Sequence, residues 1–123
     1  MIKESLDLLR ESECSNIMIV SSITGTYPDY HMGVYAMTKA ALDNMVKFLS
    51  DELRTFDIRI NGIAPGLVAT ELSGPIWKGN NQINEKGVGR PEEVAAVVAT
   101  VCSEDGTFMN GEIYRVHGGF PHL

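Results

Sequence analysis

The 123-residue sequence has little of what marks several specialised protein classes. It contains only two cysteines, Cys14 and Cys102, so it carries neither a disulfide framework nor clustered thiolate ligands for zinc. Its longest apolar stretch, Val94 to Cys102, is far shorter than a membrane-spanning helix. The first residues mix charges of both signs and have no apolar core like that of a signal peptide. We therefore expect a protein without a membrane span, in a reducing compartment such as the cytoplasm.

Positive charge is also scarce. The sequence has 10 lysines and arginines against 16 aspartates and glutamates, a net charge of −6, and no basic cluster. This balance disfavours nucleic acids and anionic membranes as partners. His117 and His122 stand near the C-terminus without neighbouring ligand residues, so no metal site is expected. The length and the hydrophobic fraction of 44% are those of one globular domain at most.

Apolar runs alternate with turn-forming residues along the chain and predict an α/β protein. The patterns predict strands over 17–20, 58–63 and 112–116 and helices over 1–12, 34–54 and from Pro91, with a loop over 22–33 and an irregular stretch over 67–90. The strand over 17–20 is a continuous apolar run, which is typical of parallel sheets covered on both faces. Strands that alternate with helices favour the same arrangement.

The long central helix is unusually apolar. One row of residues, four positions apart, is expected to face a core: Met37, Ala41, Met45, Leu49 and Leu53. Three further residues widen the apolar surface beyond that row: Leu42, Val46 and Phe48. We therefore expect the helix to be covered on two sides, by its own sheet and by another subunit. Three parallel strands would also leave an open sheet edge, which predicts a part of something larger or a chain that needs a partner.

The strongest chemical signal lies at the start of this helix. Tyr35 and Lys39 are four residues apart, which places both side chains on one helix face. A free phenol has a pKa of about 10, and an adjacent ammonium group favours its phenolate form, as a general acid or base at neutral pH requires. By itself such a pair is weak evidence, because it occurs often by chance.

The surrounding motifs strengthen this signal. Ser21 and Ser22 directly follow the first predicted sheet strand, and Ser22 precedes Tyr35 by thirteen residues. The next strand leads into Pro65-Gly66-Leu-Val68-Ala-Thr70. In parallel α/β sheets, ligands bind at the carboxyl ends of the strands, where these motifs lie. In these motifs, in their order and in their spacing, the sequence resembles the short-chain dehydrogenase/reductase family.

The resemblance extends through Gly89-Arg-Pro-Glu-Glu-Val-Ala and Ser103-Glu-Asp to the terminal Val116-His-Gly-Gly, and so covers nearly the whole sequence. It implies the C-terminal half of a Rossmann-type doubly wound parallel sheet. It also implies oxidoreduction between an alcohol and a carbonyl group on a small molecule, with NADP or NAD as cofactor and NADP slightly favoured.

The resemblance assigns a role to each matching residue. Tyr35 would exchange the proton with the substrate oxygen, and Ser22 would hold and polarise that oxygen. Lys39 would assist Tyr35 and bind the nicotinamide ribose. Pro65 and Gly66 would line the nicotinamide. The carboxamide would be held by two further groups, the backbone of Val68 and the hydroxyl of Thr70.

Several family features have no counterpart in residues 1–123. The family begins with a strand and a glycine-rich turn, Thr-Gly-x-x-x-Gly-x-Gly, that binds the cofactor pyrophosphate at a helix N-terminus, and neither this turn nor the later Asn-Asn-Ala-Gly stretch is present. We therefore interpret 1–123 as a partial domain that lacks the dinucleotide-binding half, and expect the isolated chain to be inactive. Two alternatives remain open: an enzyme completed by that half, or a non-catalytic remnant that associates with full-length relatives.

Finer features resemble one branch of the family, the carbonyl and retinal reductases of the dehydrogenase/reductase member-4 type. They are Gly33-Val-Tyr35, the region after Trp77 and Cys102-Ser-Glu-Asp-Gly. The terminal Pro121-His122-Leu123 keeps the last two residue types of a peroxisomal tripeptide but lacks its small first residue, so peroxisomal import is not expected. Four residues are candidate walls of a substrate pocket, with ordinary packing as an equal alternative: Tyr27, Tyr30, Met32 and Trp77. We expect His31 to be a solvated loop residue.

Overall fold

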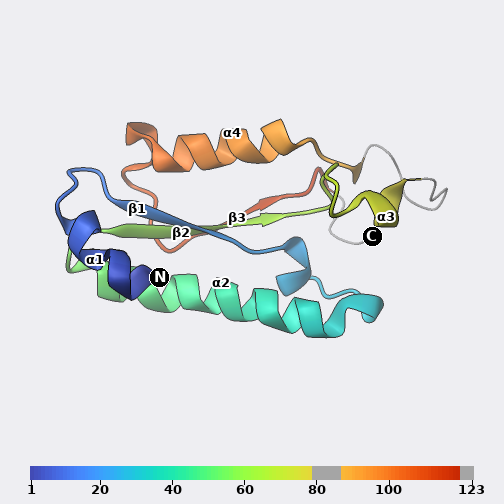
Figure 1. Ribbon diagram of the computed structural model, residues 1–123, viewed down its shortest axis with the longest axis horizontal. Helices are drawn as coiled ribbons and strands as arrows, with labels where there is room; N and C mark the ends of the chain where they lie inside the picture. Colours follow the sequence, from blue (N-terminus) through green and yellow to red (C-terminus); the bar gives the residue numbers. More distant parts are fainter. Residues whose placement is uncertain (79–86, 120–123) are drawn as a thin grey trace.

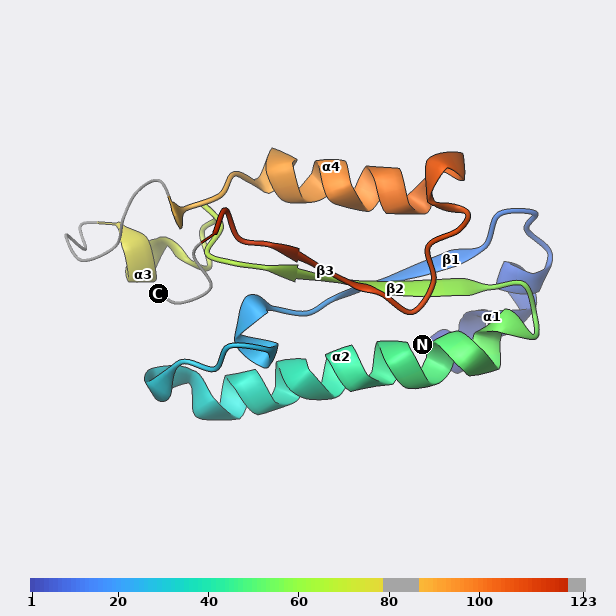
Figure 2. The same cartoon turned by 180° about the vertical axis from the view of Figure 1, so that it is seen from behind.

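The computed structural model describes residues 1–78 and 87–119, and its centre is a three-stranded parallel sheet. The strands are β1 (Asn16–Val20), β2 (Arg59–Pro65) and β3 (Ile113–Val116), in the order β1-β2-β3. Helices α1 (Ile2–Arg10) and α2 (Gly33–Arg54) cover one face, and α4 (Pro91–Cys102) covers the other (Figure 1). Figure 2 shows the same layers from behind. This is the predicted α/β architecture, and all three strands end at the same edge of the sheet.

Short helical turns fill the connections. They are η1 (Ile23–Gly25), η2 (Tyr30–Met32), α3 (Gly74–Trp77) and η4 (Glu104–Gly106). The predicted start of α4 at Pro91 is confirmed, and the other predicted helices and strands lie within two residues of their observed bounds. The stretch over 67–90, expected to be irregular, contains α3, a helix too short to show a periodic pattern. Its residues 79–86, and the terminal Pro121-His122-Leu123, lie outside the described part of the chain.

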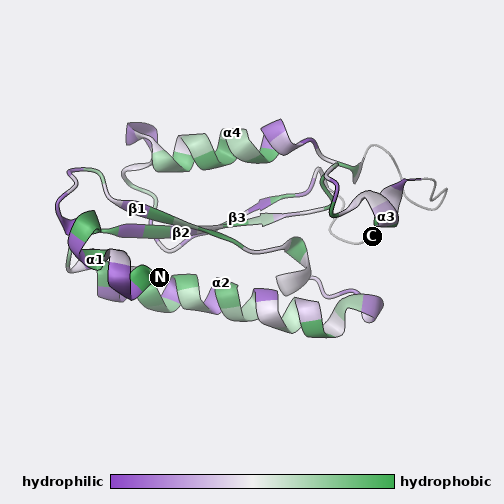
Figure 3. Ribbon diagram, viewed as in Figure 1, coloured by the Kyte–Doolittle hydropathy of each residue, from purple (hydrophilic) through white to green (hydrophobic). Residues whose placement is uncertain are grey.

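The hydrophobic core lies between the sheet and the α1/α2 layer. Its fully buried members are Val46, Leu53, Ile58 and Ile60, and apolar residues of α1 pack against them. On the opposite face, α4 buries only Val101, although much of its surface is hydrophobic (Figure 3). The two faces of the sheet are therefore unequally covered within the described residues.

The predicted apolar row of α2 is wrong in its first half. Leu53 is only 2% exposed, but Met37 is 65% exposed and Ala41 is exposed as well. An α-helix turns by about 100° per residue, so sixteen residues place Leu53 about 160° around the axis from Met37. A row with a spacing of four therefore winds off the buried face, and the residues that α2 buries are Ala36, Val46 and Leu53.

Strand β1 lies at an edge of the described sheet. The carbonyl of Ser15 accepts the Arg59 N–H at 3.1 Å, and the Ser21 N–H donates to the Ile63 carbonyl at 2.8 Å. Peptide groups of successive strand residues point to opposite sides. The backbone N–H and C=O groups of the odd-numbered residues of this strand therefore bond to β2. The backbone groups of Met18 and Val20 point to the open edge.

No helix within residues 1–78 and 87–119 is long and apolar enough to cross a membrane.

Candidate functional site

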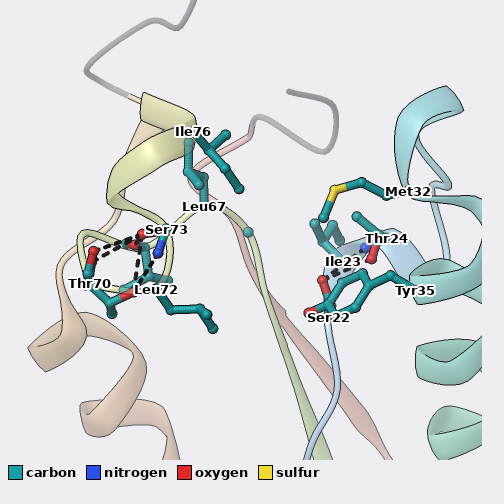
Figure 4. Close-up of a pocket in the computed structure, with 12 residues that line it drawn as sticks. Ser22, Ile23, Thr24, Met32, Tyr35, Leu67, Thr70, Leu72, Ser73 and Ile76 are labelled. Atoms are coloured by element: carbon teal, nitrogen blue, oxygen red, sulfur yellow. Dashed lines mark hydrogen bonds between the residues drawn. The ribbon is translucent and has the colours of Figure 1, made fainter. Parts of the chain in front are cut away.

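A cavity of about 340 Å³ lies where β1 and β2 end, which is the edge at which parallel sheets bind ligands. Residues that follow β1 form one side, called here the β1 wall: Ser22, Ile23, Thr24, Met32 and Tyr35. Residues that follow β2 form the other side, the β2 wall: Gly66, Leu67, Val68, Thr70, Leu72, Ser73 and Ile76. Figure 4 shows the two walls facing each other. None of these described lining residues carries a charge.

The β1 wall is built on a tight turn held against α2. Ser21 Oγ donates to the Lys39 carbonyl at 3.1 Å, which joins the end of β1 to the helix. Ser22 caps η1, and its Oγ accepts hydrogen bonds from the Thr24 N–H at 3.3 Å and the Thr24 hydroxyl at 3.0 Å. Ser22 and Thr24 are 9% and 5% exposed. A Cβ at Gly25 would lie 3.0 Å from backbone atoms of α2, so the turn and the helix are in close contact.

Tyr35 and Lys39 lie one turn apart at the start of α2, on one face as their spacing predicts. The Lys39 ammonium lies 5.4 Å from the centre of the Tyr35 ring. Lys39 Nζ also donates to the Val20 carbonyl at 3.2 Å, on the open edge of β1. Tyr35 is 41% exposed and lines the cavity, so its hydroxyl is accessible to a ligand.

The β2 wall is organised by Ser73. Its Oγ donates to the Val68 carbonyl, accepts the Thr70 N–H at 3.1 Å and accepts the Trp77 indole N–H at 3.2 Å. The Thr70 hydroxyl lies 3.1 Å from the same oxygen. Ser73 therefore contacts the Val68 backbone and the Thr70 hydroxyl, the two groups that the resemblance assigns to the nicotinamide carboxamide.

Two further contacts hold the β2 wall against neighbouring segments of the chain. A Cβ at Gly66 would lie 2.8 Å from the Cβ of His117, so this close approach requires glycine. Gly89 pairs with Val68 in an isolated parallel bridge. The Gly89 N–H donates to the Leu67 carbonyl at 2.8 Å, and the Gly89 carbonyl accepts the Ala69 N–H at 2.8 Å. Gly89 lies just before α4, so the start of that helix and the β2 wall are connected.

Five of the predicted site residues line one cavity: Ser22, Tyr35, Gly66, Val68 and Thr70. The other two lie beside it, because Pro65 is the last residue of β2 and Lys39 is one turn further along α2. The sequence interpretation missed Thr24 and Ser73. The sequence gives only a weak signal for them. Thr24 follows Ser22 by two positions and Ser73 follows Thr70 by three, and such spacings of hydroxyl residues favour local side-chain hydrogen bonds.

Of the candidate pocket-wall residues, Met32 lines the cavity, whereas Tyr27, Tyr30 and Trp77 are not among the lining residues. His31 is exposed, as expected of a solvated loop residue, and Cys102 is half-buried. Burial raises the pKa of the Tyr114 phenol, but this residue belongs to β3 and does not line the cavity. The described residues contain no group of three or more His, Cys, Asp or Glu that could hold a metal ion.

A parallel α/β sheet with a serine and a tyrosine hydroxyl on one wall at its carboxyl edge is the architecture of short-chain dehydrogenases and reductases. The sequence matches the family model described as enoyl-(acyl carrier protein) reductase over residues 1–121. The chain belongs to the short-chain dehydrogenase/reductase family, a family of oxidoreductases.

Individual relatives confirm the predicted branch. The chain is 34% identical to "Dehydrogenase/reductase SDR family member 4" from Rattus norvegicus, over 98% of this chain and 46% of the relative. It is 39% identical to the protein of the same name from Bos taurus, over 88% of this chain and 42% of the relative. A solved glucose/ribitol-type short-chain dehydrogenase/reductase from Brucella melitensis superposes with a TM-score of 0.80 at 30% identity, over 91% of this chain and 47% of that one. The chain thus spans about half the length of these relatives.

Proposed function

We propose that this chain carries the catalytic half of an NAD(P)-dependent oxidoreductase that interconverts an alcohol and a carbonyl group. The observation that supports this most directly is the single cavity with the Ser22 and Tyr35 hydroxyls on the β1 wall and Gly66, Val68 and Thr70 on the β2 wall. General acid catalysis needs a proton donor at the reacting oxygen, and Tyr35 has the accessible hydroxyl for that role. The proposed cofactor is NADP or NAD, and the resemblance slightly favours NADP.

In the reductive direction, Tyr35 gives its proton to the carbonyl oxygen while Ser22 donates a hydrogen bond to that oxygen. A nicotinamide held against the β2 wall would supply the hydride for the carbonyl carbon. Lys39, close to the Tyr35 ring, provides a positive charge beside the phenol as it loses its proton. Oxidation of the alcohol reverses these steps, with Tyr35 as the proton acceptor.

The β2 wall suits the nicotinamide end of such a cofactor. Gly66 lines the cavity at the end of the strand, and Val68 and Thr70 offer backbone and hydroxyl groups suited to an amide. Residues 1–123 hold no glycine-rich turn for the pyrophosphate. We therefore propose that they form a partial domain whose cofactor site needs a glycine-rich half of the same fold.

The uncharged lining favours a neutral, largely apolar substrate. Six lining side chains are apolar: Ile23, Met32, Leu67, Val68, Leu72 and Ile76. A charged substrate would lose its hydration there without a charged partner, which is costly. We also propose a reducing compartment such as the cytoplasm, since Cys14 and Cys102 are both free thiols.

A second candidate function is an interaction module, favoured by the open edge of β1. Unpaired strand edges associate readily with further strands. The neighbouring helix α2 also exposes large apolar side chains, Val34, Met37 and Phe48. These surfaces fit association between copies of this chain or with full-length relatives.

Carbonyl reduction by a completed domain separates these functions, and cofactor binding tests whether the domain is partial. Residues 1–123 alone should show no saturation below millimolar NADPH or NADH, followed by energy transfer from Trp77, the sole tryptophan. The reason is that the nicotinamide contacts are a small part of the binding energy of a dinucleotide. A fusion to the glycine-rich half of a relative should bind at micromolar concentration and reduce a neutral ketone. A folded fusion that binds cofactor but reduces no carbonyl substrate would favour the interaction module.

A further inference from the structure

The Thr24 side chain makes a specific contact with Ser22 inside the β1 wall. The Thr24 hydroxyl donates to Ser22 Oγ at 3.0 Å, and the Thr24 N–H donates to the same oxygen at 3.3 Å (Figure 4). We propose that Thr24 is a positioning residue that makes Ser22 an obligatory hydrogen-bond donor toward the substrate oxygen. This inference rests on the proposed role of Ser22.

A serine hydroxyl can form only a limited number of hydrogen bonds. Ser22 Oγ has one proton to donate and two lone pairs that can accept. The two donors of Thr24 occupy both lone pairs. Ser22 can then only donate its own proton, and because Ser22 lines the cavity, a carbonyl oxygen bound there is available as the acceptor.

Burial makes this arrangement stable. Ser22 and Thr24 are 9% and 5% exposed, so water competes little for either hydroxyl. Hydrogen bonds are electrostatically stronger in such an environment than in water. The turn itself has little freedom, because a Cβ at Gly25 would lie 3.0 Å from the Lys39 carbonyl carbon and the Ala40 nitrogen of α2. Thr24 is also β-branched, which restricts its χ1 rotation.

The consequence concerns the proton of Tyr35. A Ser22 oxygen with a free lone pair could accept the Tyr35 O–H and divert it from the substrate. With both lone pairs filled, the substrate oxygen is the acceptor for both hydroxyls. Tyr35 then transfers its proton to that oxygen as hydride reaches the carbon, and Ser22 keeps its own proton throughout.

The first test measures turnover in the fusion with a glycine-rich half. Thr24→Val removes the hydroxyl and keeps the branched shape, and it should lower kcat about three- to tenfold, the equivalent of one hydrogen bond. KM for the cofactor should stay unchanged. Thr24→Ser keeps the hydroxyl and should restore most of the lost rate.

A double-mutant comparison separates positioning from general stability. In a Ser22→Ala background, Thr24→Val should have no further effect on kcat, because its partner oxygen is gone. A loss of rate of the same size in both backgrounds would overturn the proposal.

A second test needs neither cofactor nor activity. In the 123-residue chain with Cys14→Ser and Cys102→Ser, Ser22→Cys places a thiol at the same position, and the pH dependence of its alkylation reports its ionisation. The Thr24 hydroxyl donates to the thiolate and favours it. Alkylation should therefore require a higher pH after Thr24→Val, while Thr24→Ser should match the parent.

The two tests distinguish separate failures. An identical alkylation profile with Thr24 and Thr24→Val would overturn the inference, whatever the activity of the fusion. A fusion that binds cofactor but has no reductase activity, together with a shifted alkylation profile, would overturn the proposed function and keep the contact between Thr24 and Ser22.

Discussion

The two walls of the cavity are built in different ways. The β1 wall buries Ser22 and Thr24, and hydrogen bonds and close backbone contact hold it against α2. The β2 wall lies on a connection between strands, and its Leu72 is 92% exposed although it lines the cavity. Its local order comes from the hydroxyl of Ser73 rather than from a hydrophobic core.

The two walls suit two different requirements of a catalytic site, fixed proton-exchanging groups and adaptable ligand-enclosing groups. Groups that exchange or direct protons need fixed positions, because small displacements strongly reduce rates. Groups that enclose different ligands can be more adaptable, and segments with few buried contacts open at lower free energy. We therefore expect substitutions in the β1 wall to affect turnover or folding, and substitutions in the β2 wall to affect binding.

The largest expected effect is that of Tyr35→Phe in the fusion with a glycine-rich half. It removes only the hydroxyl that exchanges the proton, so kcat should fall by about 10²- to 10⁴-fold while cofactor affinity stays nearly constant. Tyr30→Phe is the matched control, because Tyr30 is 94% exposed and does not line the cavity. Retention of a tenth of the parent rate in Tyr35→Phe would remove Tyr35 from the proposed role.

Gly25→Ala tests how tightly the β1 wall is packed. The new methyl group would lie 3.0 Å from backbone atoms of α2, so the free energy of unfolding should fall by about 1–3 kcal/mol. Gly33→Ala is the control, since Gly33 has helical dihedral angles and open space around it. That substitution at the first residue of α2 should leave the free energy of unfolding unchanged or raise it by less than about 1 kcal/mol. Urea unfolding of the 123-residue chain measures both, and equal effects would contradict the close packing of the β1 wall against α2.

Thr70→Val tests the β2 wall. Loss of one hydrogen bond to the carboxamide should raise the cofactor KM of the fusion about two- to tenfold and leave kcat within a factor of about two. Thr55→Val serves as control, because the exposed Thr55 hydroxyl donates to the Glu52 carbonyl at the end of α2 and does not line the cavity. If Thr70→Val lowered kcat and left KM unchanged, the proposed division between the walls would be wrong.

The smallest effect concerns Glu93, at the start of α4 next to Gly89. Its carboxylate accepts the Arg90 N–H at 2.7 Å, and this hydrogen bond holds the pKa of Glu93 below its ordinary value. The stabilisation is present above the unfolded-state pKa of about 4.3 and disappears as the pH falls through the lowered folded-state pKa.

Glu93→Gln should therefore slightly lower the free energy of unfolding at pH 7. The difference between parent and variant should decrease as the solution is acidified below about pH 4. Urea unfolding at several pH values checks this, with Glu92→Gln as the neighbouring control. A difference that grew on acidification would contradict the assigned hydrogen bond.

Some features of this protein follow from the sequence alone. The three longer helices, the strands and their order along the chain could be predicted, because Pro91, the apolar runs and the turn residues act over a few neighbouring positions. The family could also be predicted, since Ser22, Tyr35 and Lys39 keep a fixed spacing on elements that are themselves local. The roles of these residues stay predictions until activity is measured.

Only the tertiary structure decided which side chains meet. The sequence pattern placed Met37 toward a core, but the sheet contacts another face of α2 and leaves Met37 exposed. It also gave no weight to Thr24 or Ser73, whose hydroxyls order the two walls. Such contacts depend on angles and distances between chain segments, which the close packing of the whole domain fixes. Local patterns therefore determined the elements, and long-range packing determined the cavity between them.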